Sequence, residues 1–273
     1  MRTIKNILRK IIPKTIFKFA QPFWHGMLAL FYAWYFGNPS KKMIVIGVTG
    51  TNGKSTTSNL IAKILEEAGF KTGLISSVNY KTSNNEKLND IKMTTPSGWF
   101  IQKSLAEMVK NKFEYAVLEI SSQGLEQNRH LGIEFDVAVF TNLTPEHIEA
   151  HGSFENYKLA KAKLFASLSQ GKGKREKGKV LKTIVCNADD EHGQFFADFT
   201  ADRKISFGIK NTQANLVATN ITQSPAGVSF NLSSLTFNLK LKGHFDVYNA
   251  LSSIALAKSQ DIDLKISKLA LEK

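Results

Sequence analysis

Cysteine is almost absent from this chain of 273 residues. Cys186 is the only one, so no disulfide can form within one molecule. This excludes a disulfide-stapled scaffold and fits a reducing compartment. Because Cys186 falls in a predicted strand, we interpret it as a small buried hydrophobe. The length is sufficient for one large α/β domain or two modest ones.

Acidic residues are missing from the first part of the chain, where Glu66 is the first carboxylate. Residues 1–42 contain eight Lys and Arg, and the whole chain has a net charge of +13. A second basic cluster covers residues 172–179. Nucleic-acid binding would explain such charge. The glycines within the second cluster favour a solvated surface loop instead, and we expect no nucleic-acid partner.

Long hydrophobic runs are also lacking, although residues 19–40 carry no charge and are dense in Phe, Trp and Tyr. We expect a helix that begins at Pro22 and ends near residues 37–39. Roughly sixteen residues span about 24 Å, which is shorter than the ~30 Å hydrocarbon core of a bilayer. Both flanks are basic, so a single span would leave one of them on the wrong side. No small-residue cleavage site follows, which argues against a secretory signal.

Two interpretations of residues 1–42 remain open from the sequence. In the first, residues 1–40 form an interfacial anchor that holds a cytoplasmic protein at the inner face of a membrane. In the second, they form a helix docked on protein, either on this domain or on another one.

A glycine-rich turn in residues 43–57 is the most informative feature present. The apolar run from Met43 to Val48 predicts a buried strand, and a helical pattern follows the turn. The backbone N–H groups of residues 50–54 are expected to wrap phosphate oxygens. Lys54 would meet the β- and γ-phosphates and Ser55 would ligate Mg²⁺. The predicted nucleotide-binding residues of the turn are Gly50, Thr51, Asn52, Gly53, Lys54, Ser55 and Thr56. The glycine spacing departs from the common pattern, because Val48 stands where that pattern has its first glycine.

Strand and helix patterns alternate from residue 43 to about 210, which predicts an α/β fold with a mostly parallel sheet flanked by helices. From residue 214 to 242 the pattern changes to short segments of alternating apolar and polar residues separated by turn residues, which predict a small antiparallel sheet. The predicted strands are 43–48, 72–76, 115–120, 136–141, 180–186 and 204–207. Helices are predicted to begin near Ser55, Ser97, Ser153 and Asp189, and to cover 247–257 and 262–273.

Polar residues gather after the predicted strands, where ligands bind in open α/β sheets. The segments concerned are 119–129, 141–152, 157–163 and 243–249. Glu119 ends an apolar strand, the usual place for a carboxylate that holds Mg²⁺. Taken alone, each of these residues has an ordinary structural explanation. In combination with the phosphate-binding turn, they predict one ligand site.

With these motifs the chain resembles the Mur ligase family, in particular the central ATP-binding domain of the UDP-N-acetylmuramoyl-tripeptide synthetase branch. The resemblance covers residues 43–260, and the unusual glycine spacing of residues 49–56 is that family's own. It implies that Glu119 and His147 hold magnesium and that Lys161 is a carbamylated lysine near the metal. It places Lys54, Lys161 and His147 in catalysis and Asn249 at the nucleotide. The residues implied to contact the muramoyl-peptide are Thr94, Thr95, Ser121, Gln127 and Arg129.

The resemblance also implies a reaction. The γ-phosphoryl group of ATP would pass to a carboxylate of a UDP-muramoyl-peptide, and the amine of an amino acid would displace phosphate to form an amide. Lys54 and two Mg²⁺ ions would stabilise the charge during transfer. ATP and Mg²⁺ are therefore the expected cofactors.

The chain departs from the family pattern in several places. Gln123 stands where the family has His, and Asp246 where it has Asn. About forty residues precede the turn, fewer than the family's UDP-binding domain needs, and residues 261–273 are expected to begin a linker or a C-terminal domain. We therefore expect this chain to bind nucleotide but to ligate poorly alone.

Two other functions remain as alternatives. One is a ligase of the folylpolyglutamate or poly-γ-glutamate synthetase type, and the other is a membrane-tethered nucleotide-binding pseudoligase. The run from Ser121 to Arg129 favours the muramoyl branch. Retention of Lys54, Glu119, His147 and Lys161 argues against an inactive site.

Overall fold

The computed structural model describes residues 14–89, 93–146, 148–169, 180–241 and 243–273. Its centre is an eleven-stranded sheet in the order β11-β10-β9-β8-β7-β6-β1-β5-β2-β3-β4. The strands from β9 to β2 are parallel to one another. Both edges of the sheet are antiparallel. The predicted α/β fold with a mostly parallel sheet is therefore confirmed.

The strands lie close to their predicted positions. The central ones are β1 (Ile44–Thr49), β2 (Thr72–Ile75), β5 (Tyr115–Glu119), β6 (Val137–Phe140), β7 (Thr183–Asn187) and β8 (Arg203–Gly208). The region predicted as antiparallel contains β9 (Leu216–Ser224), β10 (Gly227–Leu232) and β11 (Leu235–Leu239). It extends the main sheet, because β9 pairs in parallel with β8. The short hairpin of β3 (Asn79–Lys81) and β4 (Glu86–Leu88) was not predicted, since three-residue strands leave no clear periodic pattern.

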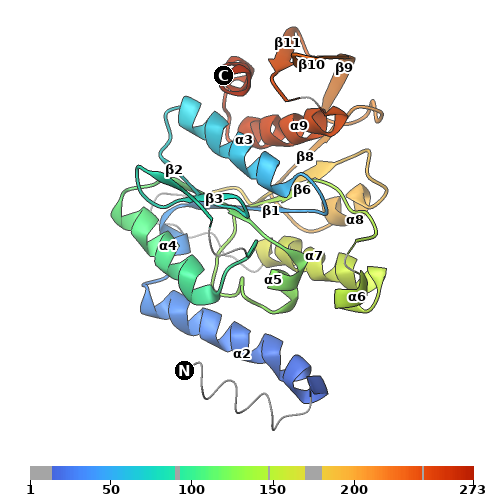
Figure 1. The fold of residues 1–273 in the computed structure, drawn as a ribbon. Helices are drawn as coiled ribbons and strands as arrows, with labels where there is room; N and C mark the ends of the chain where they lie inside the picture. Colours follow the sequence, from blue (N-terminus) through green and yellow to red (C-terminus); the bar gives the residue numbers. More distant parts are fainter. Residues whose placement is uncertain (1–13, 90–92, 147, 170–179, 242) are drawn as a thin grey trace.

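Helices cover both faces of the sheet (Figure 1). One face carries α3 (Lys54–Glu67), α9 (His244–Ser259) and α10 (Leu264–Glu272), whose apolar side chains share a core with the strands. The other face carries α4 (Gly98–Lys110), α5 (Ser122–Glu126), α7 (Phe154–Leu168) and α8 (Gly193–Ala197), with the short α6 (Ile148–His151) beside α7. The hydroxyls of Ser97 and Ser153 accept backbone N–H bonds at the starts of α4 and α7, as their positions predict.

The helix predicted to begin at Pro22 begins earlier. Helix α2 spans Lys14–Tyr35 with Pro22 inside it, and a 3₁₀ turn, η1 (Pro39–Lys42), follows. An interior proline costs a helix about 3 kcal/mol. Packing against α4 offsets this cost, because Gly26, Ala29 and Ala33 of α2 are buried against the domain. Among the described residues, no helix is long and apolar enough to cross a membrane.

A buried ion pair connects three parallel strands at the end of the sheet opposite the glycine-rich turn. The Asp136 carboxylate accepts a 2.8 Å hydrogen bond from the Val45 N–H and lies 3.2 Å from Lys182 Nζ. Lys182 Nζ also donates to the Phe135 carbonyl. Because β1, β6 and β7 all begin here, this pair holds the relative alignment of the strands whose other ends carry the site.

We expect Asp136→Ala to lower the free energy of unfolding by about 3–5 kcal/mol, since it leaves the Lys182 ammonium buried without its main counter-charge. Urea titration followed by circular dichroism would measure the change. Asp198→Ala, at an exposed position, is the matched control and should change stability by less than about 1 kcal/mol. Equal stability of the two variants would contradict the role given to the pair.

Candidate active site

Two glycines allow the turn between β1 and α3 to approach its neighbours closely. Gly50 has φ +154° and Gly53 has φ +80°, in the region that side chains rarely adopt. A Cβ added at Gly50 would lie 2.0 Å from Thr141 Oγ1, and one at Gly53 would lie 2.1 Å from Asn249 Oδ1. Val48 is buried inside β1, so the first glycine of the turn comes only after the strand has ended. This explains the glycine spacing that the sequence showed.

The segment after β6 holds the turn in shape. The Thr51 N–H donates to the Asn142 carbonyl and the Asn52 N–H donates to Asn142 Oδ1, each over 2.8 Å. Thr141 Oγ1 donates to the Asn52 carbonyl. These bonds fix the backbone of residues 50–53 before any ligand binds, which lowers the entropy that binding would otherwise cost.

Lys54 begins α3 and lies over this turn. Its Nζ donates a 2.7 Å hydrogen bond to the Thr51 carbonyl. Burial lowers the pKa of Lys54, while the nearby carboxylates of Glu119 and Glu146 act in the opposite direction. The ammonium therefore stands at the helix N-terminus, where the helix dipole also favours an anion.

Glu119 lies at the end of β5 beside the start of α3 and is 2% exposed. Its carboxylate accepts hydrogen bonds from Ser55 Oγ (2.8 Å), from the Ser77 N–H (2.7 Å) and from Ser77 Oγ (2.8 Å). A carboxylate and a hydroxyl at hydrogen-bond distance are the oxygen ligands that Mg²⁺ uses beside nucleotide phosphates. The pair of Ser55 and Glu119 thus fits the predicted metal site.

Ser77 is a residue that the sequence analysis missed. Its Oγ lies 3.0 Å from Thr94 Oγ1 as well as 2.8 Å from Glu119. An ionised carboxylate only accepts, so the single Ser77 O–H donates to Glu119 and the Thr94 hydroxyl donates to Ser77. Ser77 thereby joins the predicted metal ligand to the predicted substrate residue. The one sequence feature that pointed to Ser77 was its position just after β2, at the same edge of the sheet as Glu119.

The predicted substrate residues form a second network around Thr95. Thr95 Oγ1 accepts from the Ser121 N–H (2.8 Å) and bonds Ser121 Oγ (3.1 Å). Arg129 donates a 2.8 Å bond to the Thr95 carbonyl. The N-terminus of α5 and the loop of residues 93–95 are therefore held together.

Lys161 projects from α7 toward the glycine-rich turn and is only 1% exposed. Its Nζ donates a 2.7 Å bond to the Gly50 carbonyl and lies 4.4 Å from the centre of the Tyr157 ring. Burial lowers the pKa of Lys161 well below its ordinary value, and the charge of Lys54 lowers it further. A buried amine beside the phosphate-binding turn is unusual for a purely structural lysine.

Segments 141–152 and 157–163 were predicted to carry site residues, but the contacts of Tyr157 and His151 within them were not predicted. Tyr157 shares a 3.0 Å hydrogen bond with Thr51 Oγ1. His151 lies 3.0 Å from Ser122 Oγ through Nε2 and 3.1 Å from Glu126 through Nδ1. Helix α7 is thereby connected to the glycine-rich turn, and α6 is connected to α5. Tyr157 could have been suspected from its position one helical turn before Lys161.

A hollow of about 310 Å³ brings these groups together. Of the predicted site residues, it is lined by Gly50, Thr51, Lys54, Thr94, Thr95, Ser121, Arg129 and Lys161. Its other lining residues are Met93, Ser122, Gln123 and Tyr157. The residues predicted to bind phosphate, the Lys161 amine and the residues predicted to bind substrate thus face one space.

Some predicted residues stand outside this hollow. Asn249 packs against Gly53, and its Oδ1 accepts a 3.2 Å bond from Thr57 Oγ1. Gln127 follows α5 and does not line the hollow, and its buried Oε1 has no hydrogen-bond partner among the described residues. His147 lies outside the described residues, so its predicted role stays a prediction.

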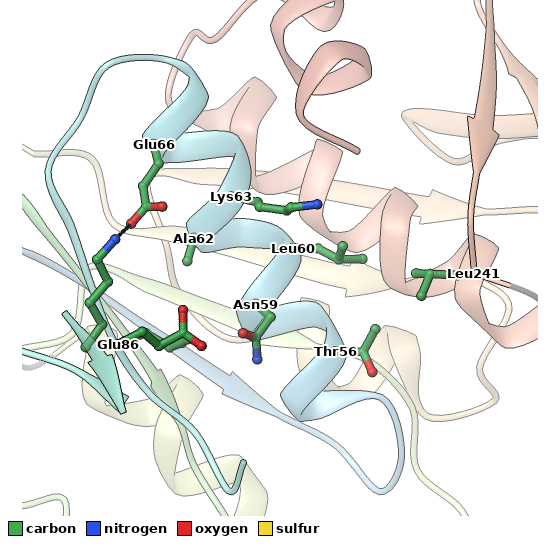
Figure 2. A pocket seen from close by; sticks show the side chains of 10 residues that line it. Thr56, Asn59, Leu60, Ala62, Lys63, Glu66, Glu86 and Leu241 are labelled. Carbon is green, nitrogen blue, oxygen red and sulfur yellow. Dashed lines mark hydrogen bonds and ion pairs between the residues drawn. The ribbon is translucent and has the colours of Figure 1, made fainter. Parts of the chain in front are cut away.

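A second hollow of about 330 Å³ lies beside α3, where the predicted nucleotide ligand Thr56 lines it together with Leu60 and Lys63 (Figure 2). Lys81 and Glu66, which form an ion pair, also line this hollow. Apart from Thr56 it contains none of the predicted site residues, so we assign the site to the first hollow.

The sequence matches the family model described as "Mur ligase middle domain" over residues 48–257. A UDP-N-acetylmuramoyl-L-alanyl-D-glutamate–2,6-diaminopimelate ligase from Halalkalibacterium halodurans is 39% identical over 242 residues, which are 87% of this chain and 48% of that protein. The enzyme of the same name from Chlamydia caviae is 40% identical and covers 82% of this chain and 44% of its own length. The chain thus spans about half the length of the curated relatives it matches.

Solved structures agree with this assignment. A structure of the same kind of diaminopimelate ligase superposes with a TM-score of 0.73 at 30% identity, over 85% of this chain and 46% of that one. MurF from Acinetobacter baumannii superposes with a TM-score of 0.67 at 19% identity, covers 92% of this chain and 49% of its own, and shows the shared fold. The resemblance inferred from the motifs is confirmed: the chain belongs to the Mur ligase family and contains its middle domain.

Proposed function

We propose that this chain supplies the ATP- and carboxylate-binding part of an ATP-dependent acid–amino-acid ligase of peptidoglycan precursor synthesis. The observation that carries the proposal is the single hollow in which Lys54 and Lys161 face Thr95, Ser121 and Arg129. The two lysines suit a polyphosphate. The hydroxyls of Thr95 and Ser121 and the Arg129 guanidinium suit a polar substrate that carries a carboxylate. The relatives named as diaminopimelate ligases favour a UDP-muramoyl-peptide as that substrate.

The reaction needs two negatively charged groups held close together. Lys54 and the N–H groups at the start of α3 would bind the phosphates, because a helix N-terminus favours anions. The N–H groups of Thr51 and Asn52 were expected to do the same, but they donate to Asn142 instead. Arg129 and the hydroxyls of Thr95 and Ser121 would orient the substrate carboxylate toward the γ-phosphoryl group. Transfer then gives an acyl phosphate, and an incoming amine displaces phosphate to leave the amide. Positioning of the two reactants accounts for most of the rate.

Mg²⁺, when bound, would neutralise charge on the phosphate oxygens. Ser55 and Glu119 are the residues that would hold it, and a carbamate on Lys161 would add a further anionic oxygen. The predicted metal role of His147 and the predicted nucleotide contacts of Thr56 and Asn249 belong to the same proposal, as does a substrate contact of Gln127. The division into residues 1–42, 43–260 and 261–273 is likewise proposed.

We propose a cytoplasmic site of action, where ATP is available. The expected membrane contact of residues 1–40 rests on different residues, those on the surface of α2, and is a separate proposal.

Trapping of the acyl phosphate tests the ligase proposal directly. With ATP, Mg²⁺ and a UDP-muramoyl-dipeptide, hydroxylamine should convert the acyl phosphate into a hydroxamate that mass spectrometry detects. Lys54→Ala should lower ATP affinity by tenfold or more, about 1.4 kcal/mol, because a charge-assisted phosphate contact is lost. Lys63→Ala, an exposed position on the same helix, is the matched control and should bind ATP normally. Unchanged ATP affinity in Lys54→Ala would contradict the proposal.

Ser77→Ala should weaken the binding of Mn²⁺, used as a reporter for Mg²⁺, by about tenfold in the presence of ATP. The reason is that Glu119 loses a hydrogen bond that orients its carboxylate. Ser77→Thr retains the hydroxyl and should restore affinity, while Ser83→Ala, nearby in the β3–β4 turn, should have no effect. Electron paramagnetic resonance of free Mn²⁺ measures the affinity. A loss that Ser77→Thr does not restore would show that Ser77 acts by packing alone.

Carbamylation of Lys161 can be detected without turnover. The buried neutral amine is expected to add CO₂, forming an N–C bond to give –NH–COO⁻ with release of one proton. Protein equilibrated with ¹³C-bicarbonate should show a carbamate carbon signal by NMR that disappears in Lys161→Ala. Lys158→Ala, on the same helix, should keep the signal. Absence of a Lys161-dependent signal in the presence of ATP and Mg²⁺ would exclude the modification.

A further inference from the structure

One side of α2 exposes a continuous stripe of large apolar side chains. Phe23 is 74% exposed and Trp34 is 69% exposed, values that are high for aromatic residues of a folded domain. The spacing by one, three and four residues places the whole set on one helix face. The exposed residues of this stripe are Phe23, Trp24, Met27, Leu30, Phe31, Trp34 and Tyr35.

The opposite side of α2 is made of small residues and is already occupied by the domain. Gly26 lies against Leu131 and Asn128, and a Cβ at Gly98 of α4 would lie 3.1 Å from Ala29. Asn128 Nδ2 also donates to the Pro22 carbonyl. The part of the helix from Pro22 to Ala33 is therefore held on α4 and on the segment after α5, and its aromatic stripe faces outward. Figure 1 shows α2 lying across the outer side of this layer.

The charged residues that flank α2 in the sequence are all basic. Residues 1–18 contain six Lys and Arg, and Lys41 and Lys42 are exposed just beyond the other end of the helix. No acidic residue occurs before Glu66. Two copies of this face would bring like charges together, which argues against a second copy as the occupant. Anionic lipid headgroups complement the charge, and Trp and Tyr prefer the boundary between headgroups and acyl chains.

We propose that α2 is an interfacial helix whose aromatic stripe inserts into the surface of a membrane rich in anionic lipid. Because its other face is packed on the domain, the helix lies parallel to the surface instead of crossing the bilayer. Asn128 and Leu131, which contact α2, lie in the same segment as Gln127 and Arg129. Membrane contact would therefore hold the predicted substrate-binding side of the domain near the lipid surface. The two interpretations of residues 1–42 are then compatible: one face of α2 is docked on this domain, and the opposite face would bind the membrane.

Binding of the full chain to vesicles tests the proposal without nucleotide or substrate, so its failure is separate from any failure of the ligase chemistry. The chain should sediment with vesicles of phosphatidylcholine containing phosphatidylglycerol, and about tenfold less with phosphatidylcholine alone or at high salt. In Trp99→Phe, Trp24 and Trp34 are the only tryptophans left, and their emission should shift to the blue on addition of anionic vesicles.

Trp24→Ser combined with Trp34→Ser should lower vesicle binding by about tenfold or more, because both anchors of the stripe are lost. Leu88→Ser combined with Leu269→Ser removes two exposed apolar residues elsewhere and is the matched control. Three results would overturn the proposal: no sedimentation with anionic vesicles, an unshifted emission in Trp99→Phe, or equal binding by both double variants. A vesicle-indifferent dimer in light scattering, or retention only by an acidic protein, would assign the stripe to a different occupant and overturn it as well.

Discussion

The site depends above all on the parallel alignment of β1 between β5 and β6. In this register Val48 pairs with Glu119, and Thr49 pairs with Phe140. The three strands therefore end together, and the Glu119 carboxylate, the glycine-rich turn and the segment of residues 141–146 meet at one edge of the sheet. A shift of β5 by one residue against β1 would turn Glu119 to the opposite face of the sheet and separate it from Ser55.

This edge brings two lysine amines together at the glycine-rich turn. Lys54 and Lys161 both point at the turn, and burial lowers the pKa of each. Burial makes the charged form of either amine costly unless an anion lies beside it, so the arrangement favours a ligand with several negative charges. Glu119 balances part of this charge and is itself held by Ser55 and Ser77. The same network reaches Thr94, so the predicted metal and substrate residues share one set of hydrogen bonds.

Much of the fold could be predicted because its central strands are buried apolar runs and its helices begin at recognisable residues such as Ser97 and Ser153. The site could be predicted where several motifs point to one edge of a parallel sheet, as Lys54 and Glu119 do. Ser77 could not be singled out, because one serine after a strand has no distinctive neighbours. The start of α2 was predicted wrongly, because proline is common at helix starts and the packing that tolerates Pro22 inside the helix involves residues far away in the chain.

The sequence by itself determined the fold class, the glycine-rich turn, the family and the basic, aromatic character of the N-terminal segment, since each depends on residue type and short-range spacing. Tertiary structure alone decided which polar groups touch. It placed Ser77 between Glu119 and Thr94, moved Gln127 away from the hollow, and packed Gly26 and Ala29 inward so that the aromatic stripe faces out. These outcomes depend on contacts between residues tens of positions apart, which local patterns do not encode.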